Sequence, residues 1–196
     1  NSDISFREDV VDVDLRQGTL ATFTLLDTMR QVGVPAVVFA STSAVFGEAR
    51  EMPTAESYGP ALPISLYGAS KLACEGLMSA FAHLAGIRVR IFRFGNVVGR
   101  NGTHGVVVDF IRKLRRDPTT LEILGDGRQA KPYLHVDDCV EGMLFGVEHA
   151  PDQVNVYNLA CPGATEVKRI ADMVVEAMGL NAVEYRFTGE DRGWPG

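Results

Sequence analysis

The segment "PAVVFAS" at residues 35–41 decides the fold, because it is a short and continuous apolar run. Such a run is typical of a strand that is buried on both faces of a parallel sheet. Before it, residues 18–30 carry apolar side chains at helical spacing, and Gly33 would end that helix. A helix that leads into a buried strand is a repeating element of α/β proteins.

The same alternation of helix and strand signals continues along the chain. Proline and glycine predict loops at residues 47–64 and 95–105. Apolar runs and helical spacing predict the remaining strands and helices, with Asp137 or Asp138 as the N-cap of the helix that ends near residue 147. The strands are expected at 89–94, 121–124, 133–136 and 154–160, and the helices at 67–84, 106–115, 137–147 and 166–178. This order predicts parallel βαβ units and therefore the α/β class.

The composition favours a globular protein of one domain, or of one domain with a small appendage. The 196 residues are 46% hydrophobic and 22% charged, with a net charge of −6. Nucleic acid is not an expected partner, because the basic segment at 112–116 is short and suits a solvated helix face. Without a long apolar run or a signal peptide, we expect no membrane segment and a cytoplasmic location. Three separated cysteines and four scattered histidines predict no metal site.

Hydroxyl and phenol groups follow the first predicted strand. The segment "STSAVFG" at 41–47 comes directly after it, where ligands bind in open α/β sheets. In "SLYGASK" at 65–71, Tyr67 and Lys71 are four residues apart and share one helix face. A lysine ammonium favours the phenolate, which with a nearby hydroxyl can act as a general base toward an alcohol. On its own the pair is more typical of an ordinary helix surface.

Four motifs that follow one another in the sequence favour a general base over an ordinary helix surface. They are "STSAVFG", "YGASK", "RFGNVVG" and "GDGRQAKPYLHVDD". Together they resemble the extended short-chain dehydrogenase/reductases, and within them the NAD-dependent epimerase/dehydratase family that modifies nucleotide sugars. The resemblance runs from Asp12 to Trp194. It implies a doubly wound, Rossmann-like parallel sheet in residues 1–99 and a small nucleotide-sugar lobe in 100–196, with the chain returning to the sheet around 133–160.

The resemblance also implies the catalytic residues. Tyr67 matches the catalytic base of the family, and Lys71 matches its partner, which also binds the ribose of NAD. Alignment on "VFG" places the family's serine or threonine at Thr42, which would bind the sugar hydroxyl that is oxidised. Phe94 matches the residue that packs beside the nicotinamide.

Further positions match residues that bind the UDP-sugar in the family. Asn96, Lys131 and Arg192 would contact the diphosphate, although the family usually has an arginine at the position of Lys131. Alternatively, Asn96 only stabilises its own loop. The remaining positions would line the sugar pocket or hold the uracil: Gly105, Val106, Glu122 and Leu124.

Three departures from the family pattern refine the expectation. Ser43 and Ala44 stand where the 4,6-dehydratases carry Asp and Glu, so dehydration is disfavoured. Pro132 replaces a common aspartate. The sequence has no GxxGxxG or GxGxxG turn, which holds the cofactor pyrophosphate. We therefore expect a fragment that lacks the first βαβ units and the end of the substrate lobe.

The resemblance implies a 4-epimerase of UDP-hexoses such as UDP-glucose and UDP-galactose, which acts by transient NAD-dependent oxidation at C4. It also implies a homodimer formed through helices 18–30 and 67–84. A related uronate epimerase or decarboxylase is an alternative with the same first step. An alternative of another class is a non-catalytic fragment or pseudoenzyme that binds a nucleotide sugar or a partner.

Overall fold

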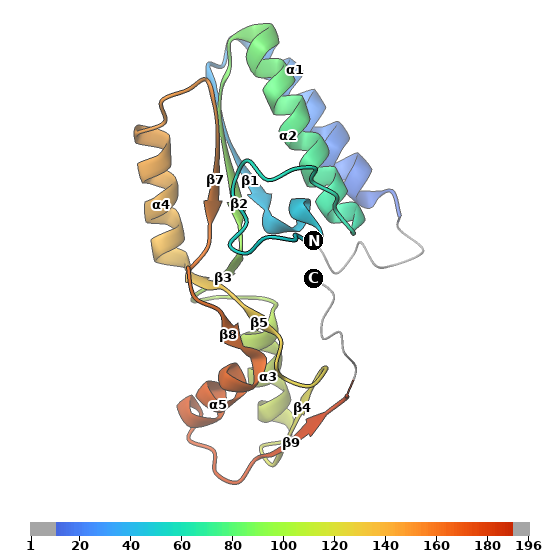
Figure 1. Ribbon diagram of the computed structural model, residues 1–196, viewed down its shortest axis with the longest axis vertical. Coiled ribbons are helices and arrows are strands. Elements are labelled where there is room, and N and C mark those ends of the chain that lie inside the picture. Colours follow the sequence, from blue (N-terminus) through green and yellow to red (C-terminus); the bar gives the residue numbers. More distant parts are fainter. Residues whose placement is uncertain (1–10, 190–196) are drawn as a thin grey trace. The chain divides into compact units, whose positions relative to one another are not determined.

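The computed structural model describes residues 11–189, and the chain divides into two units (Figure 1). A three-stranded parallel sheet forms the centre of the first unit. The first unit contains the described residues up to Gly95 together with Asp137–Ala160. The second contains Asn96–Val136 and the described residues from Cys161 onward.

In the first unit the strand order is β1–β2–β7, with β2 in the centre. The strands are β1 (Ala36–Thr42), β2 (Arg88–Phe94) and β7 (Val154–Leu159). Helices cover both faces of this sheet, α4 on one face and α1 with α2 on the other (Figure 1). The helices are η2 (Asp14–Leu20), α1 (Ala21–Val32), α2 (Leu66–Ala85) and α4 (Val136–Glu148). This arrangement confirms the predicted doubly wound, Rossmann-like sheet.

The core of this unit lies between the sheet and the pair α1 and α2. It is built from Leu26, Met29, Met78, Phe81, Ala82, Ile87, Val89 and Ile91. On the other face, the fully buried Phe92 stacks on Tyr157 with ring centroids 5.3 Å apart. Gly146 lets α4 approach this pair, because an added Cβ would lie only 2.8 Å from the Phe92 ring.

Local sequence signals set both ends of α2, the helix that carries Tyr67 and Lys71. At its start, the Ser65 hydroxyl accepts a hydrogen bond from the Gly68 amide at 3.0 Å and acts as an N-cap. At its end, Gly86 adopts the left-handed conformation with φ of 69°, which glycine accommodates readily. Gly33 ends α1 in the same way, as predicted.

The second unit consists of three small two-stranded sheets and two helices. Helices α3 (Val106–Arg116) and α5 (Val167–Ala177) pack over a core of Phe110, Leu114, Leu121, Ile123, Ile170, Ala171 and Val174. The parallel pairs are β3 (Asn96–Val98) with β6 (Tyr133–His135), and β4 (Thr120–Ile123) with β9 (Glu184–Phe187). The antiparallel pair is β5 (Ala130–Lys131) with β8 (Thr165–Glu166).

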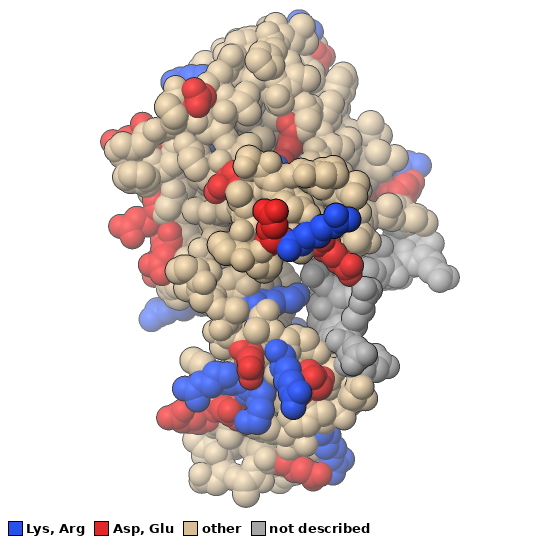
Figure 2. Space-filling view, viewed as in Figure 1, with Lys and Arg blue, Asp and Glu red and all other residues tan. Residues whose placement is uncertain are grey.

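The basic segment at 112–116 is a solvated face of α3, as expected. Leu114 is buried, whereas the three arginines of the segment are exposed. Lys113 pairs with Asp109 at 3.0 Å and approaches Glu122 at 3.6 Å. On the face shown in Figure 2, Lys and Arg side chains lie among Asp and Glu side chains. This segment is therefore partly neutralised by carboxylates of its own unit.

Three details of the predicted elements are wrong. Strand β1 is not buried on both faces, because it lies at an edge of the described sheet and its Ala36, Val38 and Ala40 are exposed. The region 95–105, expected as a loop, contains the short strand β3, which pairs with β6 far along the chain. Asp137 and Asp138 are not N-caps, because α4 already begins at Val136 and both residues lie in its first turn. There their charges still suit the positive end of the helix dipole. Among residues 11–189, no helix is long and apolar enough to cross a lipid bilayer.

Candidate active site

The three predicted catalytic residues lie together in the first unit, at the carboxyl end of β1. Thr42 is the last residue of β1, and its hydroxyl accepts a hydrogen bond from the Ala44 amide at 3.2 Å, at the start of η3 (Ser43–Phe46). The Thr42 side chain also lies near enough to the Tyr67 phenol to lower the pKa of that phenol. Lys71 lies one helical turn further along α2, with its Nζ 5.8 Å from the centre of the Tyr67 ring.

Close contacts hold the first turns of α2 against this edge of the sheet. Gly68 packs so tightly that an added Cβ would lie 2.6 Å from the Ala44 carbonyl oxygen. The Ser70 hydroxyl donates to the Asp14 carbonyl oxygen at 2.7 Å and lies 3.0 Å from the Thr19 hydroxyl. The small residues of "YGASK" therefore let α2 approach both η3 and η2.

Burial raises the pKa of Tyr67 above its ordinary value. The Thr42 side chain lowers this pKa, whereas the negative charge of Asp14 raises it further, and the net direction is upward. The prediction that Lys71 would lower the pKa of Tyr67 is therefore wrong for this structure. At neutral pH the Tyr67 phenol is protonated and can donate a proton.

The Lys71 ammonium binds a backbone oxygen and not the phenol, which explains why it does not lower the pKa of Tyr67. Its Nζ donates to the Ala40 carbonyl oxygen at 2.9 Å and lies 4.6 Å from the centre of the Phe39 ring. Burial lowers the pKa of Lys71, and the charges of Cys74 and Asp14 raise it in part. The ammonium is thus bound to the backbone of β1 instead of to the phenol oxygen.

Asp14 is a site residue that sequence reasoning missed. Its charge acts on both Tyr67 and Lys71, and its carbonyl oxygen accepts the Ser70 hydroxyl. No local signal marks it, since it lies more than fifty residues before Tyr67 in a polar segment. Only the packing of η2 on α2 brings it to the site.

Phe94 ends β2 at the same edge of the sheet. In the strand register it pairs with Thr42 on one side and with Leu159 on the other, and it is half-buried. The edge thus presents a hydroxyl, a phenol, an ammonium and an aromatic ring. These donors suit the hydroxyl groups of a ribose, and the ring suits a flat heterocycle, so the residues fit the nicotinamide riboside part of NAD. No group of three or more His, Cys, Asp or Glu residues that could hold a metal ion occurs within 11–189.

Apart from Thr42, the predicted substrate-binding residues that the structure describes lie in the second unit. The Asn96 side-chain amide donates to the Pro132 carbonyl oxygen at 3.2 Å, so this bond joins β3 to the residue before β6 and does not lie within its own loop. Lys131 is half-buried on β5 and pairs in register with Thr165. Arg192 lies outside the described residues.

The other predicted pocket residues lie on α3 and β4. Gly105 precedes α3 with φ of 94°, a conformation that favours glycine, and Val106 is the first residue of the helix. Glu122 is exposed on β4 with its carboxylate near Lys113, and Leu124 is exposed directly after the strand.

Comparison with known proteins agrees with this geometry. A sequence model of the NAD dependent epimerase/dehydratase family matches residues 8–160. A putative UDP-glucose 4-epimerase of Methanocaldococcus jannaschii is 31% identical over 181 residues, which cover 90% of this chain and 57% of the relative. UDP-glucuronic acid decarboxylase 1 of Arabidopsis thaliana is also 31% identical over 181 residues, which cover 88% of this chain and 40% of that protein.

A solved structure of a related enzyme is similar to this chain in both sequence and fold. A crystal structure of a UDP-galactose 4-epimerase is 41% identical, with a TM-score of 0.82, over 91% of this chain and 59% of that chain. The chain thus spans about half the length of the curated relatives that it matches. Since the family match covers most of the sequence, the chain belongs to the NAD dependent epimerase/dehydratase family.

Proposed function

We propose that this chain carries the catalytic residues of a nucleotide-sugar 4-epimerase that acts on UDP-hexoses such as UDP-glucose and UDP-galactose. The observation that carries this proposal is the meeting of Thr42, Tyr67 and Lys71 at the carboxyl end of β1. The similarity to a UDP-galactose 4-epimerase, the highest identity among the three relatives described above, supports the choice of reaction.

The residues of the site would move the proton of the C4 hydroxyl. When bound, NAD supplies a hydride acceptor whose cationic ring also favours the phenolate of Tyr67. Tyr67 then accepts the proton of the C4 hydroxyl while Thr42 hydrogen-bonds the same oxygen. Lys71, already bound to the backbone of β1, would bind the ribose. Tyr67 would return the proton when the hydride that NAD would supply returns to the opposite face of C4 of the turned 4-keto sugar, so no net oxidation would result.

The second unit would bind the UDP part of the substrate. Lys131, Asn96 and Arg192 are proposed to contact the diphosphate, because cations and amide donors suit phosphate oxygens. Gly105 and Val106 at the start of α3, with Glu122 and Leu124 at β4, are proposed to line the remaining pocket. The positive end of the α3 dipole would add to the attraction of a phosphate.

A UDP-glucuronate decarboxylase is the second candidate function, because the Arabidopsis relative is as similar in sequence as the archaeal epimerase. It would begin with the same oxidation at C4 and would use the same three catalytic residues. A 4-epimerase of uronic acids would do so as well. Dehydration stays disfavoured, since Ser43 and Ala44 in η3 carry no acid or base for the elimination of water.

We also propose a cytoplasmic homodimer. Leu20 at the end of η2 and Leu25 and Val32 in α1 are exposed, and these residues would be covered by a second copy of the chain. The cysteines within the described residues are free thiols, as is typical of a reducing compartment.

The experiment combines calorimetry with a turnover assay. NAD is titrated into the chain and into Tyr67→Phe, and conversion of UDP-galactose to UDP-glucose is then followed with NAD present. We expect both proteins to bind NAD and Tyr67→Phe to lose turnover, whereas the control Tyr58→Phe, which alters a phenol bonded only to the Arg50 amide, keeps it. Release of CO₂ from UDP-glucuronate would favour the decarboxylase. Binding of UDP-glucose without any turnover would contradict catalysis and favour the non-catalytic alternative.

A further inference from the structure

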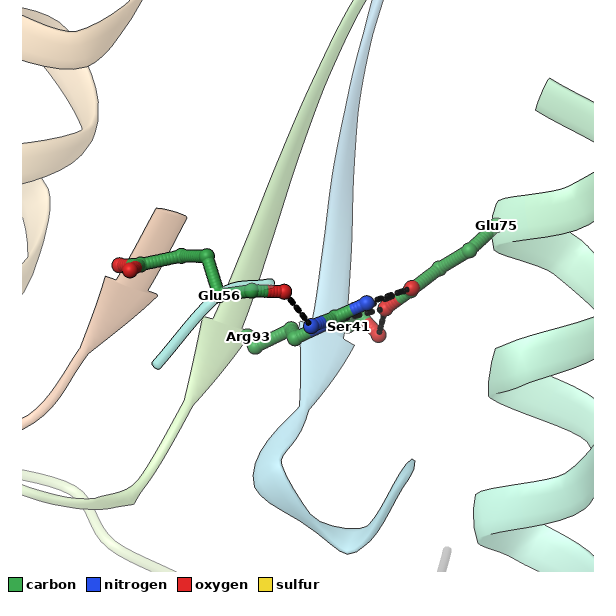
Figure 3. A network of polar contacts seen from close by, with 4 residues as sticks. All are labelled: Ser41, Glu56, Glu75 and Arg93. Atoms are coloured by element: carbon green, nitrogen blue, oxygen red, sulfur yellow. Dashed lines mark hydrogen bonds and ion pairs between the residues drawn. The ribbon is translucent and has the colours of Figure 1, made fainter. Parts of the chain in front are cut away.

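A buried network of charges joins α2 to strands β1 and β2 of the sheet (Figure 3). Glu75 on α2 is 6% exposed and Arg93 on β2 is 9% exposed. The Arg93 Nη2 lies 2.7 Å from the Glu75 Oε2, and the Arg93 Nε donates to both carboxylate oxygens at 3.1 and 3.2 Å. The Ser41 hydroxyl donates to the Glu75 Oε1 at 2.5 Å.

Each member of this network adjoins a residue of the proposed site. Ser41 directly precedes Thr42 on β1, and Arg93 directly precedes Phe94 on β2. Glu75 follows Lys71 by one helical turn and therefore lies on the same face of α2. A shift of α2 along β1 and β2 would break these bonds and move Tyr67 and Lys71 together. The network thus joins α2 to β1 and β2, in addition to the contacts that Gly68 and Ser70 make near Tyr67.

The same network reaches the loop between β1 and α2. The Arg93 Nη1 donates to the Glu56 carbonyl oxygen at 3.1 Å, and the guanidinium lies 4.8 Å from the Phe46 ring. The Glu56 carboxylate accepts a hydrogen bond from the backbone N–H of Asn158 in β7 at 2.9 Å. One arginine therefore connects the central strand, α2 and this loop, which leads from Thr42 to Tyr67.

A buried ion pair is a poor source of stability, because the loss of hydration offsets most of the attraction between the charges. A buried ion pair can, however, fix the relative position of the two elements that carry its charges. A guanidinium that binds a carboxylate through two nitrogens fixes both the distance and the orientation of the partner. The packing of α2 on the sheet already rests on a large apolar core, so the pair is not needed to attach the helix.

We propose that Glu75 and Arg93 are positioning residues, which set the place of α2 on the sheet and thereby hold Tyr67 against Thr42. The catalytic part of this inference rests on the proposed function. The positional part does not, because it concerns only where the Tyr67 phenol lies in the folded chain.

The main test is the double variant Glu75→Met with Arg93→Met, which replaces both charges by apolar side chains and leaves no buried charge unpaired. Arg93→Lys is the second variant, since it keeps the charge but loses the two-nitrogen contact. The matched control is Arg90→Met. Arg90 is 8% exposed on the same strand, but its Nη1 donates only to the backbone oxygens of Val89, Asp152 and Gln153.

The first readout is the titration of Tyr67 by NMR of ¹³C-labelled tyrosine, with the signal assigned by its loss in Tyr67→Phe. Burial is the largest cause of the raised pKa of Tyr67, so a displaced phenol should titrate closer to its ordinary value. We expect this shift in the double variant and in Arg93→Lys, and none in Arg90→Met. Folding of each variant is checked by far-UV circular dichroism. A folded Arg93→Lys or double variant that titrates like the parent chain would overturn the proposal.

The second readout is the rate of epimerisation. We expect kcat of the double variant to fall at least about tenfold, because a misplaced catalytic group slows the reaction more than it weakens binding, while KM changes less than about twofold. A rise in KM at constant kcat would overturn the positioning of Tyr67. Absence of turnover in the parent chain would overturn the proposed function instead. In that case the titration of Tyr67 alone tests whether Glu75 and Arg93 position α2.

Discussion

Gly68 follows Tyr67 in the first turn of α2, and its replacement by alanine tests how closely that turn must approach Thr42. An added Cβ would lie 2.6 Å from the Ala44 carbonyl oxygen and 3.1 Å from the Pro63 Cβ. Ordinary contacts begin at 3.4 Å. To relieve the shortfall of about 0.8 Å, α2 and η3 must separate, because the closest atom belongs to backbone and cannot rotate away.

The expected loss of stability follows from two opposing effects. Forcing a methyl group into a packed site costs about 1–3 kcal/mol. Alanine in a helix gains up to about 1 kcal/mol over glycine. Gly76 supplies the matched control, since it lies in the same helix and an added Cβ there meets nothing within 4 Å. Both variants gain the same propensity, so Gly68→Ala should be less stable than Gly76→Ala by about 1–3 kcal/mol.

The assay is urea unfolding followed by circular dichroism at 222 nm, together with the rate of UDP-galactose epimerisation. Gly76→Ala should be slightly more stable than the parent chain and equally active. In Gly68→Ala, a displacement approaching 1 Å should lower the rate on the order of 10- to 100-fold. If Gly68→Ala matched Gly76→Ala in both stability and rate, the close approach of α2 to η3 would not matter for Tyr67.

Three further predictions concern other parts of the structure. Phe92→Ala should lower the free energy of unfolding by about 3–5 kcal/mol, measured in urea, because the ring is fully buried against Tyr157. Burial, with the hydrogen bond to Asp172 and the charge of that residue, raises the pKa of Tyr185 from 10.0 to about 12. The unfolded chain therefore ionises first as pH rises through this interval, so stability should fall there, and less so in Tyr185→Phe when unfolding is measured against pH. The raised pKa of Tyr67 should fall when NAD is added, because the nicotinamide ring is cationic, and titration by ¹³C NMR with and without NAD measures this change.

The first unit was largely predictable because its signals are local. The apolar run of β1, the cap at Ser65 and the glycines that end α1 and α2 lie within a few residues of the elements that they define. The four-residue spacing of Tyr67 and Lys71 depends only on helix geometry, so their common face followed from the sequence as well.

The second unit and the charges of the site were less predictable because they depend on distant contacts. Strands β3, β5 and β8 are two or three residues long and pair with partners more than thirty residues away. Glutamate is rarely buried, and nothing near Glu75 in the sequence shows that Arg93 will pair with it. The pKa of Tyr67 depends on burial by the folded chain, which a Tyr–Lys spacing does not reveal.

The position of α2 shows why the motif alone does not make a site. A helix with tyrosine and lysine on one face can still slide or turn on the sheet. Three contacts along the first half of α2 prevent these motions: Gly68 against Ala44, Ser70 on the Asp14 carbonyl oxygen, and Glu75 on Arg93. Each involves a residue at least 18 positions away from its partner, so the geometry of Tyr67 is a property of the assembled unit. A chain with the same Tyr–Lys spacing but without these contacts should therefore hold its phenol less firmly and react more slowly.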